Sequence, residues 1–228
     1  MHAHPICVIT VICGHYGSGK TNLAINIAMD KAREGKKVTV ADMDIVNPCF
    51  TSSVYSDVLE RSGITVLSPA FAATNAEVPA LPASFNSVFV TDGDVMIDAG
   101  GDDAGATVLG RFSERIREKG YEMIYVTNMY RPFTAAPEDS VNVMREIENA
   151  CNLKVTGIAN NSHLKDATSL SVITDSLNYA KCVSSLAGVP LLFTTVPRSL
   201  SSALPEDENF YLTDVYVTAI WEKGNEYD

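Results

Sequence analysis

Residues 14–21 read Gly14-His15-Tyr16-Gly17-Ser18-Gly19-Lys20-Thr21. This is the spacing G-x-x-x-x-G-K-[ST], the pattern of a phosphate-binding loop or P-loop. Its three glycines let the backbone turn tightly and point N–H groups inward, which makes a nest for an anion at the start of a helix. An apolar, β-branched run precedes the loop at 6–13, and a helical pattern follows it at 21–33. This strand–loop–helix order predicts a binding site for the polyphosphate of a nucleotide and disfavours a glycine-rich turn that binds nothing.

Each position of the loop has an expected role. Backbone N–H groups cradle the phosphates, the Lys20 ammonium lies on the β- and γ-phosphates, and the Thr21 hydroxyl binds Mg²⁺. The nucleotide-binding residues that we predict in this stretch are Gly14, His15, Tyr16, Gly17, Ser18, Gly19, Lys20, Thr21 and Asn22.

The composition limits the class of protein. The chain has 228 residues, of which 46% are hydrophobic and 20% charged, as expected of a globular protein with a sizeable core. It shows no internal repeat and no low-complexity linker, so we predict a single domain over 1–228. The net charge of −11 disfavours nucleic acid or an anionic membrane as the main partner.

The cysteines and apolar stretches indicate a compartment. The five cysteines are scattered and form no C-x-x-C pair, which disfavours a disulfide framework and favours a reducing cytoplasm. No apolar stretch reaches membrane-spanning length, and the first residues do not read as a signal peptide.

Two further strands are predicted to end in carboxylates. The run 37–41 is followed by Asp42 and Asp44, and the run 95–97 is followed by Asp98 and a glycine pair. Acids at the carboxyl ends of parallel strands lie in the crevice where ligands bind. We predict that Asp44 orients or deprotonates the attacking water and that Asp98, in a Walker B position, helps to hold Mg²⁺. Asp42 either supports Lys20 or the metal shell, or is a solubilising residue at the strand end or a helix cap.

Other segments leave alternatives open. The loop 128–131 reads Asn-Met-Tyr-Arg and lacks the aspartate of N-K-x-D, which disfavours GTP. Arg131 either binds an anion near the site or is a solvated loop arginine. The long loop 68–87 has no readable role. An apolar stripe within 204–223 predicts a final helix.

The ordered set of motifs is Gly14 to Thr21, Asp42-x-Asp44, Asp98-x-Gly100-Gly101 and Gly157 to Asn161. It resembles the MinD/ParA branch of P-loop ATPases (the CobQ/CobB/MinD/ParA nucleotide-binding domain), which includes the nitrogenase iron protein and metallocentre-assembly ATPases. The resemblance implies an α/β fold: a three-layer sandwich with a mostly parallel, doubly wound sheet and helices on both faces.

The resemblance also implies roles for residues. Asp44 would belong to a first switch loop and act on the hydrolytic water, and Asp98 would open a second switch loop. Asn161 would contact adenine, and the segment around Pro197 would close over the base. The implied cofactors are ATP and Mg²⁺. The implied activity is that of an ATPase switch with a protein partner, for delivery of a metal or activation of a redox enzyme, and with a nucleotide-dependent homodimer.

Two departures from the family leave questions open. His15 stands where these ATPases typically have a second lysine, and Tyr16 stands where glycine is usual. His15 either donates a hydrogen bond across a dimer or is only a loop residue. The alternative function is an ATP-dependent small-molecule kinase or ligase of the dethiobiotin synthetase type, in which 68–87 and Arg131 bind the substrate. A module that binds nucleotide without hydrolysis is the third interpretation.

Overall fold

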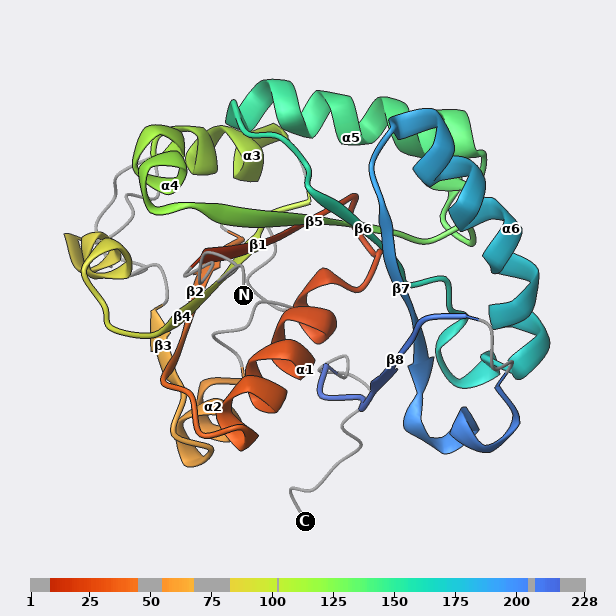
Figure 1. The fold of residues 1–228 in the computed structure, drawn as a ribbon, viewed down its shortest axis with the longest axis horizontal. Helices are drawn as coiled ribbons and strands as arrows, with labels where there is room; N and C mark the ends of the chain where they lie inside the picture. Colours follow the sequence, from red (N-terminus) through yellow and green to blue (C-terminus); the bar gives the residue numbers. More distant parts are fainter. Residues whose placement is uncertain (1–8, 45–54, 68–82, 102, 205–207, 218–228) are drawn as a thin grey trace, which may run out of the picture.

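An eight-stranded sheet in the order β3-β2-β4-β1-β5-β6-β7-β8 forms the middle layer of the computed structural model (Figure 1). Every adjacent pair of strands runs parallel. The structure describes residues 9–44, 55–67, 83–101, 103–204 and 208–217. The strands are β1 (Ile9–Cys13), β2 (Val38–Met43), β3 (Thr65–Leu67), β4 (Asp94–Ala99), β5 (Tyr121–Thr127), β6 (Gly157–Asn160), β7 (Leu191–Pro197) and β8 (Phe210–Thr213).

Helices cover both faces of this sheet (Figure 1). Residues of α1 and α2 share one apolar cluster with the sheet, and residues of α3, α4, α5 and α6 share a second cluster with its other face. The helices are α1 (Lys20–Arg33), α2 (Ser56–Arg61), α3 (Asp103–Gly110), α4 (Ser113–Lys119), α5 (Pro137–Cys151) and α6 (Leu170–Ala187). The predicted doubly wound, three-layer α/β fold is therefore confirmed.

The central strand β1 is buried on both faces, as is typical of a strand in a parallel sheet. All five of its residues are buried, since α1 covers one face and α3 and α5 cover the other. A strand covered on both faces reads as a continuous apolar run rather than as an alternating one. The sequence shows this run directly before the P-loop, which places the loop at the carboxyl edge of the sheet.

The predicted final helix within 204–223 is wrong for its described part. Residues Phe210–Thr213 form β8, which pairs in parallel with β7 from Thr194 to Pro197. Tyr211 packs its ring on Phe193 at 5.0 Å between centroids and donates its hydroxyl hydrogen to Asp30 at 2.6 Å. Aromatic residues suit a pleated surface, and here tertiary pairing outweighs the helical spacing. The later residues of that prediction, 218–223, lie outside the described part of the chain.

A short C-terminal strap, residues 214–217, lies along α1 and is held by two asparagines of that helix. The Asn26 amide accepts from the Asp214 N–H at 2.8 Å and donates to the Asp214 carbonyl at 2.9 Å. The Asn22 oxygen accepts from the N–H groups of Tyr216, at 2.8 Å, and Val217, at 3.2 Å. Because an asparagine side chain can mimic a peptide group, these bonds extend the ordered backbone pairing beyond β8.

Removal of the Asn26 amide tests this anchoring. We expect Asn26→Ala to lower the free energy of unfolding by about 1 kcal/mol, because it leaves the half-buried Asp214 N–H without its partner, whereas the Asp214 carbonyl keeps its bond from the Asn22 amide. Urea unfolding followed by circular dichroism measures the change. Asn149→Ala, at an exposed asparagine of α5, is the matched control and should shift stability by less than about 0.5 kcal/mol. Equal effects of the two substitutions would contradict the anchoring role.

Candidate nucleotide-binding site

The P-loop connects the carboxyl end of β1 to the first turn of α1. Gly19 is the N-cap of α1 and has a left-handed backbone with φ 87°, and Gly17 has φ 74°. Gly14 has φ 147°, and a Cβ there would collide with the carbonyl of Val126. A Cβ on Gly19 would collide with the side chain of Asn161. The glycines of the motif are therefore required by backbone conformation and by close packing.

The loops that follow strands β5 and β6 each donate a hydrogen bond to a carbonyl of the P-loop. After β6, the Asn161 amide donates to the Ser18 carbonyl at 2.6 Å. After β5, the Arg131 Nε donates to the Gly17 carbonyl at 2.7 Å. With these two carbonyls bound from outside, the peptide groups of the loop are held in orientation, which favours N–H groups that face an anion.

Lys20 lies at the centre of this edge of the sheet. Its side chain is buried, and Nζ donates to the His15 carbonyl at 3.2 Å across the loop. The Gly100–Gly101 pair after β4 approaches the same amine, because a Cβ on Gly101 would lie 2.7 Å from Lys20 Nζ and 2.8 Å from the Tyr16 nitrogen. The second predicted switch loop therefore touches the P-loop directly, and only a residue without a side chain fits at 101.

The three predicted carboxylates gather beside Lys20. Asp42 and Asp98 are register partners on β2 and β4, and both are buried. The Asp44 N–H donates to the Asp42 Oδ1 at 3.0 Å, and Asp44 is also buried. The structure thus brings Asp42, Asp44, Asp98 and Lys20 to one edge of the sheet, as the sequence predicts.

Asp98 has an unusual environment. Both of its carboxylate oxygens are buried without a hydrogen-bond partner in the described part of the chain. Burial, and then the neighbouring Asp42, raise the pKa of Asp98 to about 8, whereas Lys20 and the Thr21 hydroxyl offset part of that rise. An additional cation beside Asp98 would stabilise the ionised form of its carboxyl group and lower its pKa.

The residues present fit Mg²⁺ only together with a nucleotide. Among the residues that the structure describes, no group of three or more histidine, cysteine or acidic side chains is arranged to hold a metal ion. Mg²⁺ commonly takes one or two carboxylates and completes its shell with water and substrate phosphates. The unpartnered oxygens of Asp98 beside the Thr21 hydroxyl suit that donor set.

Other predicted residues lie at or near the loop in different roles. The His15 ring lies 5.0 Å from the Phe133 ring, and Tyr16 is exposed. The Asn22 side chain points away from the loop to the strap, so only its backbone is left for a phosphate. Pro197 ends β7 next to Arg198, which pairs with Asp214 at 3.2 Å.

The amide of Asn161 is engaged at both ends. Its nitrogen donates to Ser18, and its oxygen accepts from the Thr195 hydroxyl at 2.5 Å. The predicted contact with adenine is not tested by this arrangement and stays a prediction. The described bonds make Asn161 a support of the P-loop.

Sequence reasoning missed His163. Its Nε2 would lie 3.3 Å from a Cβ on Gly19, so the ring stands directly behind the loop. Burial, followed by the charges of Arg131 and Lys165, lowers the pKa of His163 to about 4, which keeps the ring neutral beside the phosphate site. The only signal in the sequence was its position two residues after Asn161.

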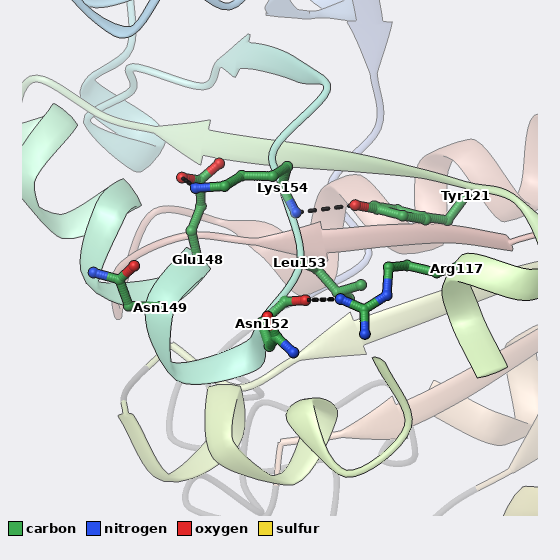
Figure 2. A pocket seen from close by; sticks show the side chains of 7 residues that line it. All are labelled: Arg117, Tyr121, Glu148, Asn149, Asn152, Leu153 and Lys154. Atoms are coloured by element: carbon green, nitrogen blue, oxygen red, sulfur yellow. Dashed lines mark hydrogen bonds and ion pairs between the residues drawn. The ribbon is translucent and has the colours of Figure 1, made fainter. Parts of the chain in front are cut away.

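Surface hollows in the described part of the chain also lie away from the P-loop. The one in Figure 2, of about 340 Å³, is lined by Arg117, Tyr121, Glu148, Asn149, Asn152, Leu153 and Lys154. Its charged groups already pair: Lys154 with Glu148 at 2.8 Å, and Arg117 with the Asn152 carbonyl at 2.9 Å. Tyr121 begins β5, so this hollow is at the opposite edge of the parallel sheet from the P-loop.

Comparisons with known proteins identify the fold. No protein-family model matches the chain, and no curated protein sequence matches it. Among solved structures it is similar to the signal recognition particle receptor FtsY from Elizabethkingia anophelis in complex with GDP, with TM-score 0.53, 19% identity, and coverage of 86% of this chain and 59% of that one. It is also similar to FtsY from Thermotoga maritima (TM-score 0.50, 22% identity, 85% and 62% covered). A third similar structure is the 54 kDa signal recognition particle protein from Aeropyrum pernix K1 in complex with GDP (TM-score 0.53, 16% identity, 82% of this chain and 41% of that one covered).

The class of fold follows from these likenesses and from the loop. The chain has the α/β fold of P-loop NTPases, with the P-loop motif between β1 and α1. It covers less than two thirds of each of the three proteins named above, and the low identities show the fold alone. None of those three is a MinD or ParA protein, so the finer assignment to that branch stays a prediction.

The raised pKa of Asp98 predicts a pH dependence of stability. The folded carboxyl keeps its proton up to about pH 8, whereas the unfolded chain releases it near pH 3.8. The folded state therefore binds more protons between these values, and the associated stability is lost as the pH rises from about 4 to 8. We expect Asp98→Asn, without Mg²⁺ or nucleotide, to be more stable than the parent by at least about 1 kcal/mol at pH 8.

Urea unfolding of both proteins in a chelator at pH 5 and pH 8 measures this difference. It should be larger at pH 8, and contributions from His163 cancel because both proteins share it. Asp175→Asn, at an exposed aspartate of α6, is the control and should show no such pH trend. A constant difference between Asp98→Asn and the parent across this range contradicts the buried, protonated state.

Proposed function

We propose that the chain is a Mg²⁺-dependent ATPase of the MinD/ParA type that works as a nucleotide switch. One observation carries the proposal: Asp98 is buried beside Thr21 and Lys20, and neither of its carboxylate oxygens has a hydrogen-bond partner among the described residues. Such a group is unfavourable unless a cation completes it. A nucleotide that brings Mg²⁺ to the P-loop supplies that charge at the right place, which explains why the chain keeps this carboxylate in its core.

The chain's own groups bind the phosphates. N–H groups of 14–19 face the anion, and the dipole of α1 adds partial positive charge at its first turn. Lys20 lies within the loop, where a fixed ammonium meets the β- and γ-phosphates. Thr21, Asp44 and Asp98 are the residues that would hold Mg²⁺. The ion would neutralise charge on the phosphate oxygens.

Asp44 is placed where a residue could orient or deprotonate the attacking water. It follows β2 by one residue, its N–H is fixed by Asp42, and it is close enough to add to the field at Asp98. A carboxylate held in this way can orient a water molecule toward the γ-phosphate and accept its proton as the phosphate bond breaks.

The Gly100–Gly101 contact supports a switch. A γ-phosphate held by Lys20 changes the surroundings of the same amine that Gly101 approaches. α3 begins at Asp103, two residues later, and a Cβ on Gly105 would lie 2.5 Å from the Gly100 Cα. Movement of the glycine pair would therefore be passed to α3, as in other order–disorder switches. The output would be binding of a protein partner or a second copy of the chain, with metal delivery or redox-enzyme activation as candidates.

The choice of base rests on the loop after β5. Residues 128–131 read Asn-Met-Tyr-Arg and lack the aspartate of N-K-x-D, which would bind the N–H groups of guanine. This favours ATP. GTP is the second candidate, supported by the GDP in two of the similar structures.

No helix in the described ranges is long and apolar enough to cross a membrane.

Nucleotide binding and turnover test the proposal. We expect the parent to bind Mg²⁺–ATP more tightly than Mg²⁺–GTP and to hydrolyse it slowly. Lys20→Ala should weaken ATP binding about 10- to 100-fold through loss of a charged donor. Asp44→Asn should lower kcat about 100-fold, with a smaller loss of ATP affinity than in Lys20→Ala. Calorimetry and phosphate release measure these quantities, with Lys119→Ala and Asp175→Asn as charge-matched controls.

The same assays separate the alternatives. Stimulation of turnover by one member of a metabolite panel would favour the kinase or ligase. Binding without turnover would favour a module that does not hydrolyse. An Asp44→Asn protein as fast as the parent would remove Asp44 from the mechanism, and no calorimetric signal for either nucleotide would refute the proposal as a whole.

A further inference from the structure

We propose that Arg131 is a positioning residue for the P-loop: its guanidinium holds the Gly17 carbonyl and keeps the loop in phosphate-binding shape before a nucleotide arrives. The inference rests on the proposed function, because it concerns how readily that loop takes a phosphate. Arg131 lies 114 residues from Gly17 in the chain, and no sequence motif links the two.

The contact is close and fits the glycine. Nε donates to the Gly17 carbonyl at 2.7 Å, and a Cβ on Gly17 would lie 3.3 Å from Nε and 3.6 Å from the Arg131 Cδ. The arginine side chain therefore lies against the face of Gly17 that another residue would fill. Hydrogen bonds from a charged donor to a carbonyl are stronger than those between neutral groups.

The Arg131 backbone is itself held firmly. Its N–H donates to the Asn128 carbonyl at 3.2 Å, and the Thr134 hydroxyl donates to the same carbonyl at 2.7 Å. Pro132 follows and starts a 3₁₀ turn, and the Tyr130 hydroxyl donates to the Val172 carbonyl of α6 at 2.8 Å. The loop after β5 is thus fixed to β5 and α6, so its arginine can act as a rigid support.

A second contact joins the same two loops. The Phe133 ring packs on the His15 ring, and His15 Nδ1 lies 3.0 Å from the Tyr16 carbonyl. Arg131 and Phe133 therefore contact the P-loop at two points on either side of Tyr16. Asn161 provides a third point from β6, at the carbonyl next to the one that Arg131 holds.

Within the described part of the chain, the charge of Arg131 has no acidic partner. The ion pairs formed by the described residues join other basic side chains to carboxylates, and Arg131 is in none of them. This is notable in a chain with 28 acidic and 17 basic residues. A positive charge left beside the loop also makes the site more attractive to a polyanion.

The physical consequence is preorganisation. A loop already held in shape loses less conformational freedom on binding, so its affinity for the ligand is higher. The loop N–H groups meet phosphates that a diphosphate and a triphosphate both have. Loss of the Arg131 contact should therefore weaken both nucleotides by a similar factor, with a smaller effect on kcat.

Three variants test this inference. Arg131→Met removes the donor and the charge, Arg131→Lys keeps a charged donor, and Arg111→Met removes an exposed arginine near the end of α3, away from the site. Calorimetry measures the affinities for Mg²⁺–ATP and Mg²⁺–ADP. We expect Arg131→Met to weaken both about tenfold, Arg131→Lys to recover most of the loss, and Arg111→Met to match the parent.

Amide hydrogen exchange of the nucleotide-free protein is the second readout. The amides of 14–19 should exchange faster in Arg131→Met, with those of α5 and β1 unchanged. Arg131→Gln replaces Arg131→Met if the latter does not fold. These readouts separate loop positioning from general stability, which would change exchange across the whole protein.

The outcomes distinguish this inference from the proposed function. A loss confined to ATP would mean a direct contact with the terminal phosphate and would overturn the positioning role. Unchanged affinities in Arg131→Met, with binding abolished in Lys20→Ala, would overturn this inference and leave the proposed function standing. Unchanged affinities in both variants would overturn the two together.

Discussion

The site depends on the interaction of the buried Asp98 carboxyl group with its charged neighbours, the acidic Asp42 and the basic Lys20. Two adjacent parallel strands each have an aspartate one residue before their end, Asp42 in β2 and Asp98 in β4, and the negative charge of one disfavours ionisation of the other. Lys20 offsets this effect only in part. The edge of the sheet where the P-loop opens therefore has more buried acid than Lys20 offsets, and that excess favours a ligand that brings a cation with it.

The P-loop is held by more than its own glycines. Loops after β5 and β6 bind two of its carbonyls, and the glycine pair after β4 contacts it from the other side. All of these segments leave the carboxyl ends of parallel strands, where open α/β sheets bind their ligands. The fold therefore brings three kinds of residue to one loop, although they are widely separated in the chain. They are the side chains that bind the loop carbonyls, the buried aspartates, and the glycine pair that approaches Lys20.

The sequence predicts the parts that depend on local constraints. Gly14, Gly17 and Gly19 appear in the motif because the turn needs unusual dihedrals, and the aspartates are visible because each ends an apolar strand. Arg131 and His163 could not be assigned, since their contacts with the loop arise only when three strands assemble. For the same reason the sequence did not show that the Asn22 side chain holds the strap, while the predicted contact of Asn22 with the nucleotide stays a prediction. Phe210–Thr213 was predicted to be helical, whereas pairing with β7 makes it a strand.

The Mg²⁺ dependence of ATP affinity tests the central claim most directly. Calorimetric titrations of the parent with ATP, in excess Mg²⁺ and in a chelator, compare the two conditions, and the same pair of titrations is made with Asp98→Asn. If the Asp98 carboxylate is kept in the core to complete a metal–nucleotide site, Mg²⁺ should tighten binding to the parent, and most of that gain should vanish in Asp98→Asn. Equal affinities with and without Mg²⁺ in the parent, or an undiminished gain in Asp98→Asn, would contradict the account.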